Sequence, residues 1–237
     1  MKFSELSISK LLFKGVQELN FPECTSIQEQ SFSPVMSGAN VLGIAQTGTG
    51  KTLAYLLPMM NLWKFSKEKH PTMLVLVPTR ELVQQVEEEA RKLAKYTSMR
   101  IGGVFGGANI NTQRAMVEEG LDLLIATPGR LIDFIDSGNV RLKNIKRLVI
   151  DEMDQLMGTG FRPQLIRILD SLPEKRQTLL FSATHTDEVS EFISQYVDQV
   201  LKIEATAAGS VSDNIHQFGY EVPNFYTKLN LLTLLLN

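Results

Sequence analysis

One stretch constrains the fold more than any other: an apolar run at 41–45, a glycine-broken loop, and a helical pattern from Lys51. In this order, strand, loop and helix form a phosphate cradle, because backbone N–H groups and the helix dipole converge on an anion. Gly48 and Gly50 permit close backbone approach. Lys51 is expected to reach the β- and γ-phosphates of a nucleotide, and Thr52 to ligate Mg²⁺. A strict phosphate loop has glycine where Ala45 stands, so a glycine-rich turn of another α/β protein stays open.

The rest of the chain alternates between apolar runs and helical patterns, after two expected helices at 7–19 and from residue 25 to just before Gly38. Strands are expected at 41–45, 73–77, 101–105, 123–126, 148–150, 178–181 and 200–203. Helices are expected near 51–66, 80–96, 109–118, 129–136, 161–171 and 186–196. Several strand runs are apolar throughout, as is typical of strands covered on both faces. The alternation predicts an α/β fold with a mostly parallel sheet and functional loops at the carboxyl ends of its strands.

The pattern changes after residue 204. Residues 205–214 begin with a small, polar run, which is typical of a linker. A strand is expected at 215–222 and the start of a helix at 228–236. Because these two elements cannot bury a core of their own, residues 215–237 are interpreted as the beginning of a second domain after a first domain at 1–204.

Composition narrows the function classes. No apolar run approaches the ~20 residues of a membrane span, and the N-terminal residues lack the pattern of a secretory signal. Cys24 is the single cysteine, which excludes an internal disulfide and disfavours a cysteine-based metal site, so a cytoplasmic protein is expected. The net charge of -2 means that nucleic acid binding would need a local site. The basic cluster Arg141, Lys143, Lys146 and Arg147 is interpreted as a solvated loop and strand start.

Acidic residues follow the apolar run 148–150. Asp151 and Glu152 at the end of a buried strand, downstream of a phosphate loop, are typical of a nucleotide hydrolysis site. Asp151 is expected to hold Mg²⁺, partly through water, and Glu152 to act as general base on the attacking water. An isolated Asp-Glu pair is more often an acidic helix start, but the phosphate loop favours the functional interpretation.

Taken together, the motifs resemble the N-terminal RecA-like, P-loop NTPase domain of DEAD-box RNA helicases in superfamily 2. The matching segments are 45–52 (AQTGTGKT), 78–82 (PTREL), 106–107 (GG), 127–130 (TPGR), 151–154 (DEMD) and 182–184 (SAT). Six motifs in the family's order are far more specific than any one of them. Met153 replaces the alanine of the DEAD tetrad, and Cys24 and Ser26 replace two prolines of the family's Q motif.

The resemblance implies ATP and Mg²⁺ as cofactors, RNA as partner, and a role for each matching residue. Catalytic roles fall on Lys51, Asp151, Glu152, Asp154, Ser182 and Thr184. Nucleotide contacts fall on Phe3, Phe21, Gln28, Ala45, Gln46, Thr47, Gly48, Thr49, Gly50, Lys51 and Thr52. Sequence-independent RNA contacts fall on Pro78, Thr79, Arg80, Gly106, Gly107, Thr127, Pro128, Gly129 and Arg130.

The resemblance also implies a second RecA-like domain, in cis, which supplies arginines to the γ-phosphate. No such arginine-rich motif occurs in this sequence, so the chain alone is expected to bind nucleotide as a monomer, hydrolyse it poorly and not unwind a duplex. Two other functions stay open: a superfamily 2 translocase that acts on DNA, and a catalytically weak, ATP-gated RNA clamp or protein-binding module.

Overall fold

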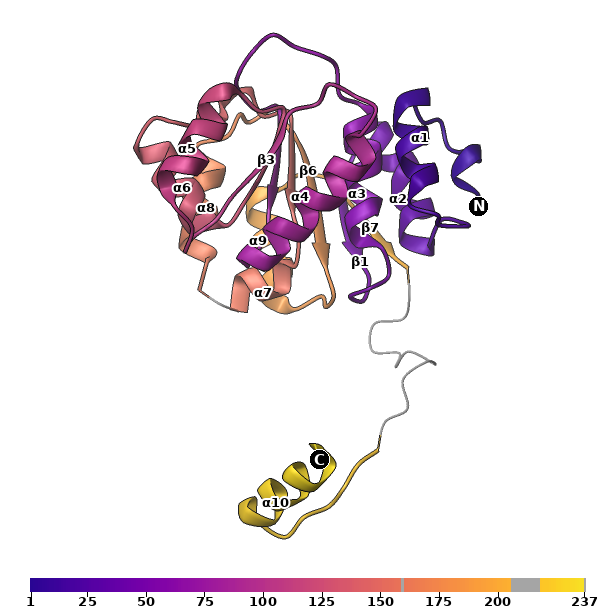
Figure 1. Cartoon of the computed structure of the whole chain (residues 1–237), viewed down its shortest axis with the longest axis vertical. Coiled ribbons are helices and arrows are strands. Elements are labelled where there is room, and N and C mark those ends of the chain that lie inside the picture. The colour runs from indigo at the N-terminus through magenta and orange to yellow at the C-terminus, as the bar shows by residue number, and fades with distance from the viewer. Residues whose placement is uncertain (159, 206–217, 237) are drawn as a thin grey trace.

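Seven parallel strands form one sheet in the part of the chain that the computed structural model describes, residues 1–158, 160–205 and 218–236. The sheet order is β3-β4-β2-β5-β6-β1-β7, and Figure 1 labels β3, β6, β1 and β7 in it. Every strand pair is parallel, so all carboxyl ends share one edge of the sheet. The strands are β1 (Asn40–Ile44), β2 (Met73–Leu76), β3 (Ile101–Val104), β4 (Leu123–Ala126), β5 (Arg147–Ile150), β6 (Gln177–Ser182) and β7 (Val200–Glu204).

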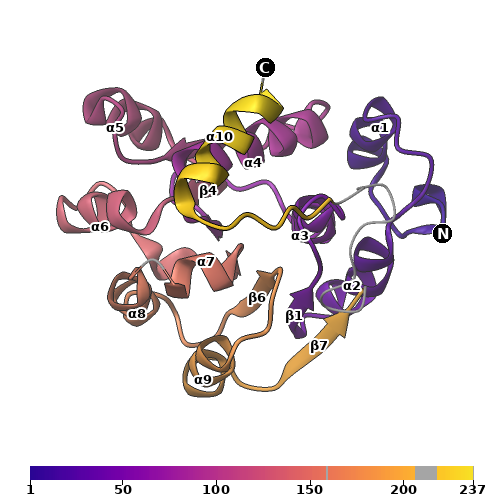
Figure 2. The ribbon, with the colours of Figure 1, turned by 90° about the horizontal axis from the view of Figure 1, so that it is seen from below.

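Helices cover both faces of the sheet, as Figure 2 shows along the strands. One face carries α1 (Lys10–Glu18), α2 (Ser26–Met36), α3 (Lys51–Asn61) and α4 (Arg80–Ala94). The other carries α5 (Ile110–Glu119), α6 (Pro128–Asp136), α7 (Met153–Gly158), α8 (Arg162–Asp170) and α9 (Asp187–Tyr196). Two short 3-10 helices, η1 (Phe3–Glu5) and η2 (Leu142–Asn144), complete this part of the chain.

Strand β2 shows why the apolar runs form the centre of the fold. Met73 and Val75 enter the core beneath α1–α4, whereas Leu74 and Leu76 enter the core beneath α5–α9. All four side chains are fully buried. Side chains alternate between the two faces of a strand, so a strand with helices on both sides must be apolar at every position.

The predicted elements of the first domain are confirmed, with ends shifted by a few residues. The helix expected at 51–66 ends at Asn61, and the one expected at 7–19 begins at Lys10. The short helix α7 was missed, because six residues carry too little periodicity to reveal it.

Beyond residue 205 the strand expected at 215–222 is not observed where it can be checked. Residues 215–217 lie outside the described residues, and Phe218 to Val222 form no strand, since no neighbouring strand pairs with them. Helix α10 (Phe225–Leu236) starts three residues before the expected 228, and none of its residues is buried. The division into 1–204, 205–214 and 215–237 stays a prediction. No helix within the described ranges is long and apolar enough to cross a membrane.

Candidate functional site

The phosphate loop joins β1 to α3 at the carboxyl edge of the sheet. Gly48 and Gly50 have φ angles of 84° and 89°, in the left-handed region that favours glycine. Gly50 is the N-cap of α3, and a methyl group on it would overlap the Nε2 atom of Gln28. Thr49 closes the loop through a hydrogen bond of 2.6 Å from its hydroxyl to the carbonyl oxygen of Gln46. The loop therefore presents backbone N–H groups at the start of α3, as a phosphate site requires.

A cavity of about 370 Å³ lies against this loop. The residues that line it include these predicted site residues: Phe21, Gln28, Thr47, Gly48, Gly50, Lys51, Thr52, Asp151 and Glu152. Ala45, Gln46 and Thr49 belong to the same loop but do not line the cavity. Phe3 does not line it either: its side chain is 4% exposed and packs in the core, whereas Phe21 is 55% exposed at the cavity.

Gln28 connects the second helix to the phosphate loop. Its Oε1 accepts a hydrogen bond from the N–H of Thr25 at 3.0 Å, and its Nε2 donates to the carbonyl of Gly50 at 3.2 Å. Thr25 is the N-cap of α2 and forms a capping box with Gln28. The capping box fixes the conformation of this segment, in which Cys24 and Ser26 stand where the Q motif has prolines.

Lys51 and Glu152 form a buried ion pair inside the cavity. Lys51 Nζ lies 3.2 Å from Glu152 Oε1, and the two side chains are 5% and 8% exposed. Neither Lys51 Nζ nor Glu152 Oε2 has a hydrogen-bond partner among the described residues. Glu152 also adopts a φ of 49°, which is strained for a residue with a side chain. Buried polar atoms without partners are costly, so this pair has donor and acceptor capacity left for a polar ligand.

Asp151 follows β5 and is held from two sides. The hydroxyl of Tyr55 donates to its Oδ2 at 2.9 Å, and the N–H of Glu152 donates to its Oδ1 at 2.9 Å. Burial, together with the nearby charge of Glu152, raises the pKa of the Asp151 carboxyl to about 6. Burial and the adjacent carboxylate raise the pKa of the Tyr55 phenol, so the phenol stays protonated as a donor.

Asp154 joins the end of β5 to the end of β6. Its Oδ2 accepts hydrogen bonds from the N–H and the hydroxyl of Thr184, at 3.0 and 2.8 Å. Its own N–H donates to Ser182 Oγ at 3.3 Å. Between the acids, Met153 is fully buried in the core beneath α5–α9, so its extra bulk relative to alanine is accommodated away from the nucleotide cavity.

The residues predicted to contact RNA gather over β3, β4 and β2, which are neighbours in the sheet. A shallow cavity of about 440 Å³ is lined by Pro78, Arg80, Gly106, Thr127, Gly129 and Arg130, together with Asp133 and Phe161. The Arg80 side chain is 53% exposed. Thr79 instead caps α4, its hydroxyl accepting from the N–H of Leu82 at 3.3 Å, and Pro128 is buried. Gly107 has a φ of 79° beside Arg80.

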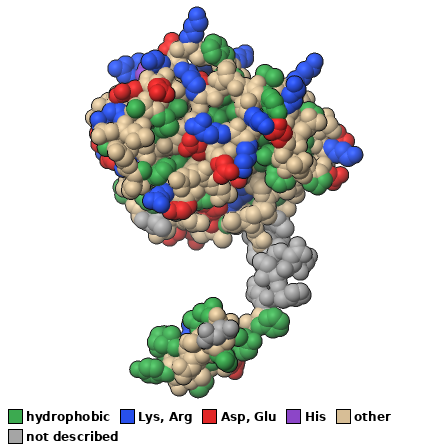
Figure 3. Space-filling view, in the orientation of Figure 1, with side chains coloured by type: hydrophobic (Ala, Val, Ile, Leu, Met, Phe, Trp, Pro, Cys, Tyr) green, Lys and Arg blue, Asp and Glu red, His purple; other side chains and the backbone are tan. Residues whose placement is uncertain are grey.

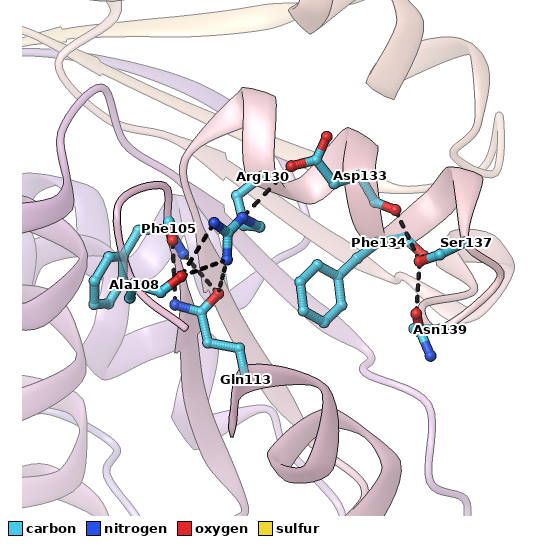
Figure 4. Close-up of polar contacts among 8 residues, drawn as sticks. All are labelled: Phe105, Ala108, Gln113, Arg130, Asp133, Phe134, Ser137 and Asn139. Atoms are coloured by element: carbon cyan, nitrogen blue, oxygen red, sulfur yellow. Dashed lines mark hydrogen bonds and ion pairs between the residues drawn. The ribbon is translucent and has the colours of Figure 1, made fainter. Parts of the chain in front are cut away.

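Arg130 is bound by the protein itself, as Figure 4 shows. Its side chain is 11% exposed and donates to the oxygen of Gln113 at 3.0 Å and to the carbonyl of Ala108 at 3.3 Å. Gln113 in turn accepts from the N–H of Phe105 at 3.3 Å and donates to its carbonyl at 3.1 Å. The buried Gln113 and the largely buried Arg130 together hold the loop that carries Gly106 and Gly107.

The comparisons with known proteins agree with this geometry. The sequence profile of the family described as DEAD/DEAH box helicase matches residues 25–192, which is more than half of the chain. The chain belongs to the DEAD/DEAH box helicase family. All predicted site residues except Phe3 and Phe21 lie within the matched span.

Named relatives of this DEAD/DEAH box chain come from fungi and bacteria. It is 43% identical to the ATP-dependent RNA helicase HAS1 of Chaetomium globosum, over 80% of this chain and 33% of the relative. It is 37% identical to the DEAD-box ATP-dependent RNA helicase CshA of Bacillus cereus, over 99% of this chain and 44% of the relative. It is also 37% identical to the ATP-dependent RNA helicase RhlB of Pseudomonas putida, over 93% and 58%. The chain thus spans about a third to somewhat over half of these relatives.

Solved structures give the same fold. A DEAD box protein from Methanococcus jannaschii superposes with a TM-score of 0.82 at 29% identity, over 87% of this chain and 56% of that one. A hypothetical ATP-dependent RNA helicase from Sulfolobus tokodaii gives a TM-score of 0.77 at 30% identity, over 83% and 57%. The predicted RecA-like α/β fold is therefore confirmed.

Two residues of the DEAD/DEAH box site escaped the sequence analysis. Tyr55 lies one helical turn after Lys51, a spacing that places both on one side of α3, but nothing in the sequence shows that its hydroxyl meets Asp151. Gln113 lies in a polar helical stretch, and no local signal distinguishes it from a solvent-exposed glutamine.

Proposed function

We propose that the protein to which this chain belongs is an ATP-dependent RNA helicase or RNA-remodelling ATPase. One observation carries the proposal: the phosphate loop, the Lys51–Glu152 pair and Asp151 surround one cavity, at the sheet edge that also carries Arg80 and the glycine doublet. ATP would occupy the first site and the RNA backbone the second. The names of the relatives, all ATP-dependent RNA helicases, support both assignments.

In the nucleotide site, Lys51 Nζ and Glu152 Oε2, which have no hydrogen-bond partner in the described part of the chain, fit a phosphate and a water molecule. Lys51 and the N–H groups of the loop would hold the β- and γ-phosphates, and Thr52 and Asp151 would hold Mg²⁺, partly through water. Mg²⁺ supplies positive charge that neutralises the phosphates during transfer. As Lys51 turns to phosphate, its pair with Glu152 loosens, and the freed carboxylate can accept a proton from the attacking water.

Adenine would be held by Gln28 and Phe21. The Gln28 amide keeps one N–H and one lone pair beyond its bonds to Thr25 and Gly50, and a glutamine amide matches the donor and acceptor at the N6 and N7 edge of adenine. Phe21 is exposed at the same cavity and is available to pack on the base. The buried position of Phe3 supports Phe21, and not Phe3, as the residue that would pack on the base.

Hydrolysis would be coupled to RNA through Asp154, Ser182 and Thr184. Their hydrogen bonds join the segment after β5, which begins with the proposed Mg²⁺ ligand Asp151, to the end of β6. RNA would be held by backbone phosphates and sugars, without sequence readout. A second RecA-like domain, which the greater length of the relatives supports, would supply arginines to the γ-phosphate. We further propose that the protein is a cytoplasmic monomer and that this chain alone binds nucleotide without unwinding.

The test is a titration of the 237-residue chain with a fluorescent ADP, competed by unlabelled ATP, GTP and CTP. Displacement by ATP alone supports both the phosphate loop and the adenine contacts of Gln28. Equal displacement by all three nucleotides would contradict the proposed adenine contacts. The absence of any binding would contradict the proposal that this chain binds nucleotide. For the whole protein, ATPase stimulation by RNA and not by DNA separates the proposal from a DNA translocase.

A further inference from the structure

Another hollow lies at the opposite end of the sheet from the two cavities described above. Its volume is about 910 Å³, within the range of roughly 300–1,000 Å³ that ligand sites occupy. Thr72 stands before β2, Arg147 begins β5, and Pro173 and Lys175 lie just before β6, so three strands contribute their amino ends. Thr72 and Pro78 bracket β2, which separates this pocket from the proposed RNA face by about 20 Å at roughly 3.3 Å per residue.

Positive charge dominates this hollow, here called the amino-end pocket. Its lining includes Lys64, Lys143, Lys146, Arg147 and Lys175, with His70, and one acidic side chain, Glu68. None of the five cations forms an ion pair with any residue in the described part of the chain. This local excess contrasts with the net charge of -2 of the sequence. Figure 3 shows Lys and Arg side chains standing at the top of the domain, the end away from the strands' carboxyl ends.

Arg147 adds the most specific observation. It is half-buried, and desolvation lowers the pKa of its guanidinium. A partly buried guanidinium with no carboxylate beside it gains more from an anionic ligand than an exposed lysine does. The sequence predicts that Arg141, Lys143, Lys146 and Arg147 are solvated. In the structure the last three join Lys64 and Lys175, which are far from them in the chain.

An aromatic side chain completes the pocket. Trp63 lies on its wall, half-buried, and its indole Nε1 is buried without a hydrogen-bond partner in the described structure. Sites for single-stranded nucleic acid combine a positively charged groove with an aromatic face on which bases stack. Trp63 meets Phe65 edge-on, with ring centroids 6.4 Å apart, and an acidic peptide would match the cations but would offer no base to stack on the indole.

We propose that the amino-end pocket is a second contact site for the phosphates of a single RNA strand, separate from the proposed RNA face beside Arg80. This inference rests on the proposed RNA-dependent function, because that function brings RNA to the protein. An RNA held at both ends of the sheet would stay bound when the face beside Arg80 releases it.

Trp63 supplies a direct test, because it is the single tryptophan of the chain. The 237-residue chain, without nucleotide, is titrated with a 20-nucleotide oligouridylate while the tryptophan emission is recorded at several salt concentrations. A saturable change in emission is expected. In the variant K143Q/K146Q/K175Q the affinity should fall by about two orders of magnitude at 0.1 M salt, since each phosphate contact on a single strand contributes a salt slope of about 0.7.

The matched control is K2Q/K10Q/K228Q, which removes the same charge from three exposed lysines outside the pocket and should keep the affinity within about twofold. Circular dichroism verifies that both variants are folded. Arg80→Gln should leave the Trp63 response intact while it weakens binding at the other face. Failure of the proposed function appears separately, as loss of fluorescent ADP binding with the Trp63 response unchanged.

Four results would overturn the proposal. The first is an unchanged Trp63 emission while fluorescence anisotropy shows that labelled RNA saturates the protein. The second is equal weakening in the pocket variant and its control. The third is an equal response to inorganic tripolyphosphate at the same phosphate concentration, which would assign the pocket to small polyphosphates. The fourth is tighter binding of poly-glutamate than of RNA, which would assign it to an acidic protein segment.

Discussion

Replacement of Tyr55 by phenylalanine removes a hydrogen bond of the proposed Mg²⁺ site. The phenol is fully buried, donates to Asp151 Oδ2 at 2.9 Å and also interacts with the side chain of Thr52, so the substitution keeps the ring but removes both polar contacts. The pKa of Asp151 is already raised to about 6 by burial and by Glu152, and the Tyr55 bond opposes that rise. Without the bond, the protonated form of Asp151, which cannot bind Mg²⁺, is favoured further.

The size of the effect follows from the strength of a hydrogen bond to a charged group, roughly 1.5–3 kcal/mol. At about 1.4 kcal/mol per pH unit, the midpoint of Mg²⁺-dependent nucleotide binding should move up by about one to two pH units. At pH 7 the Y55F variant should therefore bind Mg²⁺-ADP roughly two- to tenfold more weakly than the unsubstituted chain, and by about pH 9 the two should bind equally.

The assay is the fluorescent ADP titration repeated from about pH 5.5 to 9, with Mg²⁺ and with EDTA. The EDTA series is the internal control, because in it the two proteins should have the same affinity and the same pH dependence. A midpoint that does not move in Y55F, or a loss of affinity that is equal with and without Mg²⁺, would refute the role assigned to the Tyr55–Asp151 bond.

Three further substitutions test other parts of the site. Glu152→Gln in the whole protein should reduce ATP turnover by about 10²-fold or more while ATP-dependent RNA binding remains, and undiminished hydrolysis would remove the general-base assignment. Asp151→Asn should stabilise the nucleotide-free chain by about 3 kcal/mol at pH 8. The pKa of Asp151 is raised to about 6 in the folded chain, so ionisation of this carboxyl above that pH lowers the free energy of unfolding, and asparagine avoids the loss. Urea unfolding should show this gain vanish by about pH 4, and a gain independent of pH would contradict the argument. Gln113→Ala should lower the free energy of unfolding by about 2–4 kcal/mol, since it leaves the N–H and carbonyl of Phe105 unpaired. Urea unfolding and hydrogen exchange at the Phe105 amide measure the effect. Unchanged protection of that amide would count against the role assigned to Gln113.

Local chemistry explains what the sequence predicted well. The loop from Ala45 to Thr52 depends on φ angles that glycine permits and on a lysine and threonine at fixed offsets, all within eight residues. The strands followed from continuous apolar runs, because burial on both faces leaves no polar position. Asp151 and Glu152 were predicted as site residues because they directly follow such an apolar run.

Contacts between distant segments explain what it missed. Whether Phe3 or Phe21 faces the cavity depends on how the N-terminal segment packs, and no local pattern encodes it. The partner of Tyr55 lies 96 residues away along the chain, on a different element. Lys143 and Lys146 were expected to be solvated because their neighbours in sequence indicate a loop, whereas the pocket brings them together with Lys64 and Lys175 from two other segments.

The ion pair between Lys51 and Glu152 means that the nucleotide site carries its own competitor for the phosphate. Glu152 is tethered 3.2 Å from the ammonium group, so an arriving phosphate must displace a carboxylate whose local concentration is fixed by the fold. The same carboxylate then serves as the base in the proposed reaction. One side chain would therefore act on both binding and hydrolysis, and a substitution that removes its charge should tighten nucleotide binding while it slows hydrolysis.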